Sequence, residues 1–96
     1  MDENVENGKN QNDEKMTLAS LREKANLTQK QLADILGVTI QTISNWEQAR
    51  AVPKLTVKQV ITMLSVLPCS LFDLGKICDE IEQKVQRTKV ESSKFN

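Results

Sequence analysis

The chain has 96 residues, of which 39% are apolar and only 3% aromatic, with 13 basic and 13 acidic side chains and no histidine. This length predicts one small domain with a mainly aliphatic core, and a net charge of zero argues against a protein that binds nucleic acid tightly and indiscriminately. The chain has only two cysteines, and none of its apolar runs approaches the roughly 20 residues of a membrane span. Its N-terminus is acidic, unlike that of a signal peptide. We therefore expect a cytoplasmic protein without cofactor, metal or membrane contact.

Residues 1–15 are predicted to be a disordered acidic tail. They carry five acidic and two basic side chains, and their only apolar residue after the initiator is Val5. Such a segment cannot bury enough apolar surface to offset the entropy lost on ordering.

From Met16 the pattern becomes helical. Leu18, Leu21 and Ala25 recur at the spacing of one helix face, which predicts a first helix over about 17–25. Thr28 and Gln31 then have the spacing of a capping box, and they predict that a second helix begins there and ends at Gly37.

The same opening signal returns after Gly37. Thr39 is a candidate cap, and Val38 and Ile43 are placed as a hydrophobic staple. We therefore expect a third helix over about 40–48, followed by a loop that Pro53 closes.

Two further helices are predicted in the second half of the chain. Thr56 and Gln59 form another capping-box pair, and Pro68 would end the fourth helix, whose expected core-facing residues are Val57, Val60, Ile61, Leu64 and Leu67. Ser70 can cap a short fifth helix that contains Leu71, Phe72 and Leu74. Beyond Gly75, apolar residues at 77, 81 and 85 indicate a C-terminal helical extension and tail over 76–96. No strand-like alternation is present, so the fold class is all-α.

The segment from Leu18 to Leu74 resembles the Cro/C1-type (XRE family) helix-turn-helix domain of phage repressors and bacterial regulators. The residues that carry the resemblance are LREKANLTQKQLADILGV, TISNWE, the Pro53 loop and SLFDL. The resemblance implies a five-helix, lambda-repressor-like domain over 16–75, with flexible tails on both sides.

The resemblance also implies that the third helix enters the major groove of double-stranded DNA. The residues expected to read bases are Ile40, Gln41, Thr42 and Asn45. A Gln amide both donates to and accepts from adenine, and Ile40 or the Thr42 methyl can pack against thymine methyls. Asn45 can read a second base or bind a phosphate. For any one of these residues, the alternative is an ordinary solvated helix face.

Phosphate contacts are expected around this helix. The candidates are Gln29, Lys30, Thr39, Ser44, Arg50 and Lys54. Residues 16–74 carry six basic and four acidic side chains, which is enough for a few phosphate contacts but not for tight non-specific binding.

Two more expectations concern the scaffold. Arg22 and Glu47 match family positions that form an ion pair, and we expect this pair to tie the reading unit to the rest of the domain. The family often has Gly where this chain has Ala49. Since Ala is strained at positive φ, we expect the loop to be rearranged at this point.

The resulting function is that of a small sequence-specific transcriptional regulator, dimeric on a pseudo-palindromic site. The apolar stripe over 74–85 could form the homodimer interface or complete the monomer's own core. The alternative function is that of an antitoxin or adaptor, whose main role is to bind a protein partner such as a toxin or co-regulator. An enzyme is disfavoured, because the chain lacks His, Tyr and a glycine-rich phosphate loop.

Overall fold

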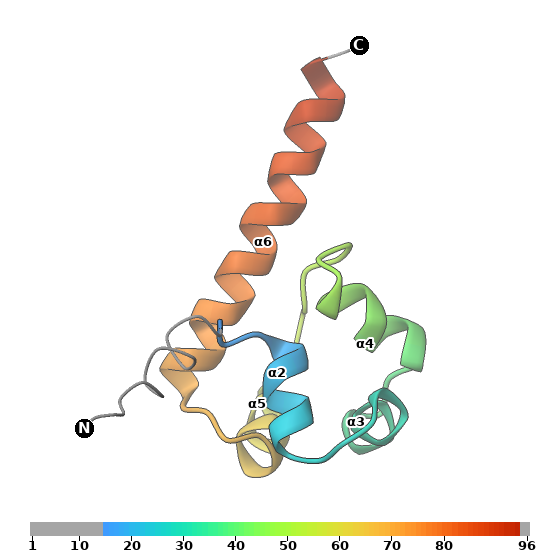
Figure 1. Ribbon diagram of the computed structural model, residues 1–96, viewed down its shortest axis with the longest axis vertical. Coiled ribbons are helices and arrows are strands. Elements are labelled where there is room, and N and C mark those ends of the chain that lie inside the picture. Colours follow the sequence, from blue (N-terminus) through green and yellow to red (C-terminus); the bar gives the residue numbers. More distant parts are fainter. Residues whose placement is uncertain (1–14, 95–96) are drawn as a thin grey trace, which may run out of the picture.

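The computed structural model describes residues 15–94, with side chains through Arg87. In this range the chain forms five helices and no strand (Figure 1): α2 Leu18–Lys24, α3 Gln29–Leu36, α4 Ile40–Glu47, α5 Val57–Val66 and α6 Leu71–Lys94. The predicted all-α class is confirmed, whereas nearly all of the predicted acidic tail lies outside the described residues. Among the described residues, no single helix is long and apolar enough to cross a membrane. Helices α5 and α6 taken together have the length and composition of a membrane span, but the chain bends by 111° between them.

Hydroxyl side chains set where the helices begin. In the capping box of α3, Thr28 Oγ1 accepts a hydrogen bond of 3.0 Å from the Gln31 backbone, and Gln31 Oε1 accepts one of 2.9 Å from the Thr28 backbone. Thr56 and Gln59 form the same box before α5. Each cap stabilises its helix by about 1 kcal/mol. The sequence therefore predicts these helix starts correctly.

Helices α3 and α4 form the most closely associated helix pair in the fold. Gly37 joins them in the left-handed conformation with φ 73°, as the sequence predicts. Ala33, which is 1% exposed, and Leu32 pack in the same core cluster as Ile43 and Trp46 of α4. The small Ala33 side chain permits close approach, so the angle between the two helices is fixed by buried contacts.

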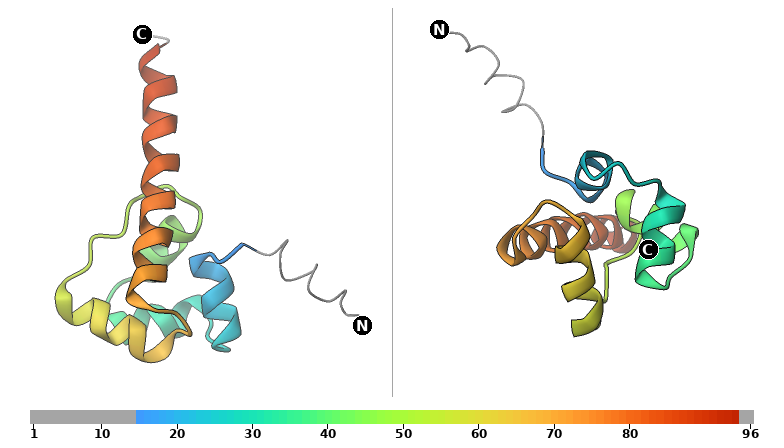
Figure 2. Two further views of the ribbon diagram at one scale, coloured as in Figure 1. Left: turned by 90° about the vertical axis from the view of Figure 1, so that its left-hand side faces the viewer. Right: turned by 90° about the horizontal axis from the view of Figure 1, so that it is seen from below.

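Helix α6 differs from the prediction, because it doesn't end at Gly75. It runs without a break from Leu71 to Lys94, 24 residues in all, and its C-terminal part projects away from the other helices (Figures 1 and 2). An interior glycine costs a helix about 1 kcal/mol, whereas burial of one large aliphatic side chain contributes about 1.5–3 kcal/mol. Leu74, Ile77 and Ile81 are all buried in the domain's own core. That burial outweighs the glycine, and it assigns this stripe to the monomer rather than to a partner.

The predicted core face of α5 is partly wrong, and the start of α6 also leaves large apolar side chains exposed. Val57 and Ile61 are 78% and 59% exposed, and Leu71 and Phe72 are 63% and 77% exposed. Helix α5 instead buries Met63, with Leu67 buried just beyond its end. Apolar positions on α5 cover an arc wider than the face that meets the core, so periodicity alone does not show which edge of the arc stays outside.

Candidate nucleic-acid interface

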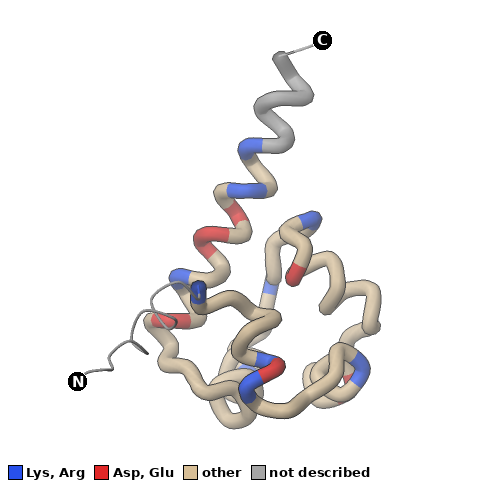
Figure 3. The backbone as a smooth tube through the Cα atoms, viewed as in Figure 1, with Lys and Arg blue, Asp and Glu red and all other residues tan. Residues whose placement is uncertain are grey.

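The exposed side of α4 carries uncharged side chains, most of which are polar. Gln41 and Ile40 are exposed, and Thr42, Ser44 and Asn45 are half-buried. The sequence of α4, IQTISNWE, has no charged residue before its last position, and Figure 3 shows the helix free of charge colours up to that end. This face therefore presents hydrogen-bond donors and acceptors without a strong electrostatic field.

Most of these polar groups are already paired along the helix. Gln41 Nε2 donates to Asn45 Oδ1 at 3.0 Å, and Gln48 Nε2 donates to Ser44 Oγ at 2.9 Å. The hydroxyl oxygens of Thr39 and Thr42 lie 2.9 Å apart, and Thr39 also caps the helix by accepting from the Thr42 backbone. These pairs use part of the hydrogen-bonding capacity of the face.

An ion pair links α4 to α2. Arg22 Nε donates to Glu47 Oε2 at 2.6 Å, and Arg22 Nη2 donates to Glu47 Oε1 at 3.3 Å. Arg22 Nη1 also donates to the Leu27 carbonyl at 2.8 Å. The two charged side chains are only 13% and 7% exposed, and the hydrogen bond to Glu47 raises the pKa of Arg22. The structure thus brings the predicted pair together at a part-buried position between α2 and α4.

Gln29 belongs to the same cluster, which the sequence did not predict. Its Nε2 donates to Glu47 Oε1 at 2.9 Å, so the first residue of α3 is held by the last residue of α4. One amide hydrogen is used in this bond and the second is left for another acceptor. Gln29 therefore joins the two helices, and it lies at a helix N-terminus, where anions are favoured.

The cationic candidates differ in their surroundings. Lys30 pairs with Asp34 at 3.3 Å on an exposed surface. Arg50 and Lys54 are exposed, and neither forms an ion pair with any residue whose side chain is described. They follow α4 in the chain. Arg50 and Lys54 are thus available to an external anion, whereas Lys30 must first leave Asp34.

The expectation about Ala49 is wrong. Ala49 adopts φ 56°, so the loop keeps the left-handed turn that a glycine would make there. The turn allows the Arg50 backbone to donate to the Asn45 carbonyl at 2.8 Å, which closes the end of α4. An alanine in this conformation costs about 1–2 kcal/mol. The closing hydrogen bond and the partial burial of Ala49 against the core offset that strain and place Arg50 directly after the turn.

Comparison with known proteins agrees with this geometry. The family model described as helix-turn-helix matches residues 18–74, which is more than half of the chain. The chain belongs to the Cro/C1-type helix-turn-helix family. This family assigns it to the DNA-binding regulators, and domains of this kind are typically not enzymes. No curated protein and no solved structure matches the chain.

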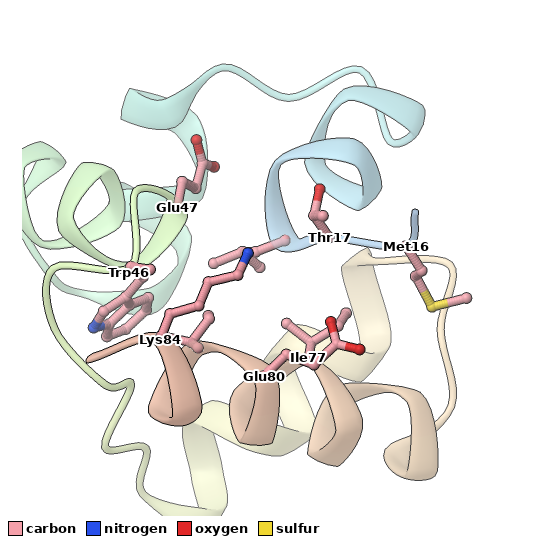
Figure 4. A pocket seen from close by; sticks show the side chains of 10 residues that line it. Met16, Thr17, Trp46, Glu47, Ile77, Glu80 and Lys84 are labelled. Atoms are coloured by element: carbon pink, nitrogen blue, oxygen red, sulfur yellow. The ribbon is translucent and has the colours of Figure 1, made fainter. Parts of the chain in front are cut away.

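In this helix-turn-helix domain α3 and α4 are the paired helices, joined by the Gly37 turn. A small cavity of about 40 Å³ lies behind the end of α4, between Trp46, the residues before α2 and helix α6 (Figure 4). Ile77 and Glu80 line it from α6. Since small-molecule sites occupy about 300–1,000 Å³, this cavity suits a few water molecules instead of an effector.

Proposed function

We propose that this helix-turn-helix protein binds double-stranded DNA in a sequence-specific manner as a small transcriptional regulator. Helix α4 is the recognition helix and lies in the major groove. The observation that carries the proposal is the uncharged, hydrogen-bonding face of α4 on a helix fixed by buried contacts to α3. Such a face suits the donor and acceptor pattern of base edges in the major groove.

Each side chain of the interface has a proposed role. Gln41 and Asn45 contact base edges, and Ile40 and the Thr42 methyl pack against thymine methyls. Phosphates on the two flanks are held by Gln29, Lys30, Thr39, Ser44, Arg50 and Lys54. Of these, Arg50 and Lys54 supply most of the electrostatic attraction, because Lys30 pairs with Asp34.

The protein acts as a homodimer on a pseudo-palindromic site. A single domain with two unpaired cations near α4 has few phosphate contacts, and a second copy doubles them. Because Leu74, Ile77 and Ile81 are buried in their own domain, the dimer uses other apolar side chains. Phe72, which is 77% exposed, is the first candidate. Sedimentation analysis of Phe72→Ser should show a shift from dimer to monomer, and an unchanged dimer would place the interface elsewhere.

DNA binding at several salt concentrations tests the main proposal. Sites are first selected from random double-stranded DNA. Gln41→Ala should weaken a selected site by about 1–3 kcal/mol and relax preference at one position, whereas Arg50→Ala should weaken all sequences alike and reduce the salt slope by about 1. Lys76→Ala, which removes an exposed cation from α6, is the matched control and should change neither. If both interface variants bind like the parent, the recognition role of α4 is refuted.

The exposed Leu71 and Phe72 also favour a second candidate function, that of an antitoxin or adaptor that holds a protein partner such as a toxin or co-regulator. In that case a partner should copurify at a fixed ratio and be lost from Phe72→Ser, and no DNA sequence should be selected. A protein that purifies alone and selects DNA would exclude this candidate.

A further inference from the structure

A side chain of α5 holds the peptide group that joins α3 to the turn before α4. Gln59 Nε2 donates to the Leu36 carbonyl at 3.1 Å, at a part-buried position between residues 23 apart in the chain. This carbonyl belongs to the last residue of α3, and no backbone N–H among the described residues donates to it. Gln59 thus satisfies an acceptor that the end of α3 leaves unpaired.

The turn gives this peptide group only a weak hold of its own. Its N–H, on Gly37, donates to the Asp34 carbonyl at 3.3 Å, whereas such bonds usually measure roughly 2.7–3.2 Å. The next amide, that of Val38, bonds well to the Ala33 carbonyl at 2.9 Å. Between these two bonds stands Gly37 at φ 73°, and a glycine adopts negative φ about as readily. The glycine therefore permits the turn but does not fix it.

Both ends of the Gln59 amide are in use. Oε1 accepts from the Thr56 backbone at 2.9 Å and completes the capping box of α5, while Nε2 reaches Leu36. The corresponding glutamine of α3, Gln31, makes the same capping bond to Thr28 at 2.9 Å, but its Nε2 bonds to no other described residue. The cross-helix bond is therefore an addition to the cap, and it couples the turn to the start of α5.

We propose that Gln59 is a positioning residue for DNA recognition. By holding the Leu36 carbonyl it fixes the Gly37 turn, and the turn sets the angle at which α4 meets the base edges. Because a small rotation of a helix displaces every side chain on it, loss of this one bond weakens the base contacts together. The inference rests on the proposed DNA-binding function and adds a determinant of specificity that lies outside the recognition helix.

Gln59→Glu is the test, because it removes the donor and keeps the capping-box acceptor, for which Glu serves as well as Gln. Selection from random double-stranded DNA with the full parent chain supplies the reference site. The measured quantity is the ratio of affinities for that site and for random DNA, well below the melting temperature of every variant. The ratio should fall roughly 5- to 150-fold, which is the discrimination that one well-placed base contact provides. The added negative charge weakens phosphate binding to both DNAs alike and cancels in the ratio.

Two controls separate positioning from stability. Gln31→Glu makes the same chemical change in the α3 box, where the amide makes no cross-helix bond to a described residue, and should leave the ratio unchanged. Thr56→Ala removes the hydroxyl cap of α5 but not the Gln59 side chain, so it should lower the melting temperature and also leave the ratio unchanged. Amide hydrogen exchange is the second readout. In Gln59→Glu alone, protection of Gly37 and Val38 relative to α2 should fall roughly 2- to 12-fold, the net effect of one hydrogen bond.

The outcomes separate the inference from the proposed function. If the parent protein selects no sequence, the proposed function fails. If it selects a site but Gln59→Glu keeps the parent's ratio, the inference is refuted while DNA binding stands. An equal loss of the ratio in either control, or a loss in Gln59→Glu without faster exchange in the turn, also refutes it. A loss confined to Gln59→Glu, together with faster exchange in the turn, supports it.

Discussion

Replacing Arg22 by Met removes the guanidinium that contacts Glu47 and keeps most of the hydrocarbon part of the side chain. Loss of one partner of a fully buried ion pair costs about 3–5 kcal/mol, because the other charge remains without compensation. Here the two side chains retain 13% and 7% exposure, and Gln29 still donates to Glu47. We therefore expect the lower end of that range, about 3 kcal/mol in the free energy of unfolding. For a domain of this size the melting temperature should fall by about 12–24 °C.

Thermal and urea denaturation, followed by far-ultraviolet circular dichroism, measures this cost. The double variant Arg22→Met/Glu47→Leu should recover most of it, since both charges are then gone. Lys30→Met is the matched control. It breaks a pair whose side chains are 68% and 67% exposed, and it should cost less than about 1 kcal/mol. A loss below about 1 kcal/mol for Arg22→Met would mean that water compensates Glu47 and would refute the argument from burial.

Three further predictions concern backbone conformation and thiol chemistry. Gly37→Ala should lower the free energy of unfolding by about 1–2 kcal/mol, because φ at this residue is 73°. Gly75→Ala should raise it by about 0.5–1 kcal/mol, because this helical position has open space for a Cβ. Paired thermal melts measure both changes. Ala49→Gly should relieve the strain at φ 56° and raise stability by up to about 1 kcal/mol, and a lower melting temperature would show that the Ala49 methyl packs too well to lose. Burial raises the pKa of the Cys69 and Cys78 thiols, and the negative charge of Asp73 adds to the effect at Cys69. Near pH 8 both thiols should therefore react with Ellman's reagent more slowly than in the unfolded chain. Their reaction should become faster only at higher pH.

Local signals in the sequence predict the helix starts well. The capping residues Thr28, Thr39 and Thr56 stand at the predicted positions because a cap depends on atoms only two or three residues away. The burial of α5 and the length of α6 are less predictable. Val57 lies at the edge of an apolar arc, and Gly75 is a local stop signal that long-range burial of Ile77 overrides.

In the candidate interface, too, local features can be predicted from the sequence, whereas features that depend on helix packing cannot. The residues on the exposed side of α4 follow from helical spacing and the family resemblance. The Gln29–Glu47 bond joins residues 18 positions apart and depends on how α3 packs against α4, so no pattern in the sequence indicates it. The Gln41–Asn45 bond is different, because spacing i, i+4 places two amides side by side on any helix. The sequence alone therefore indicates that this bond can form.

The family match ends at residue 74, but the core that supports α4 does not. Ile77 and Ile81 belong to the same buried cluster as Trp46 of α4. A recombination event or a designed chimera that exchanged only the matched segment would separate α4 from part of the core that it packs against. The unit that can be transplanted between proteins therefore extends at least to Val85, whose side chain packs against that cluster.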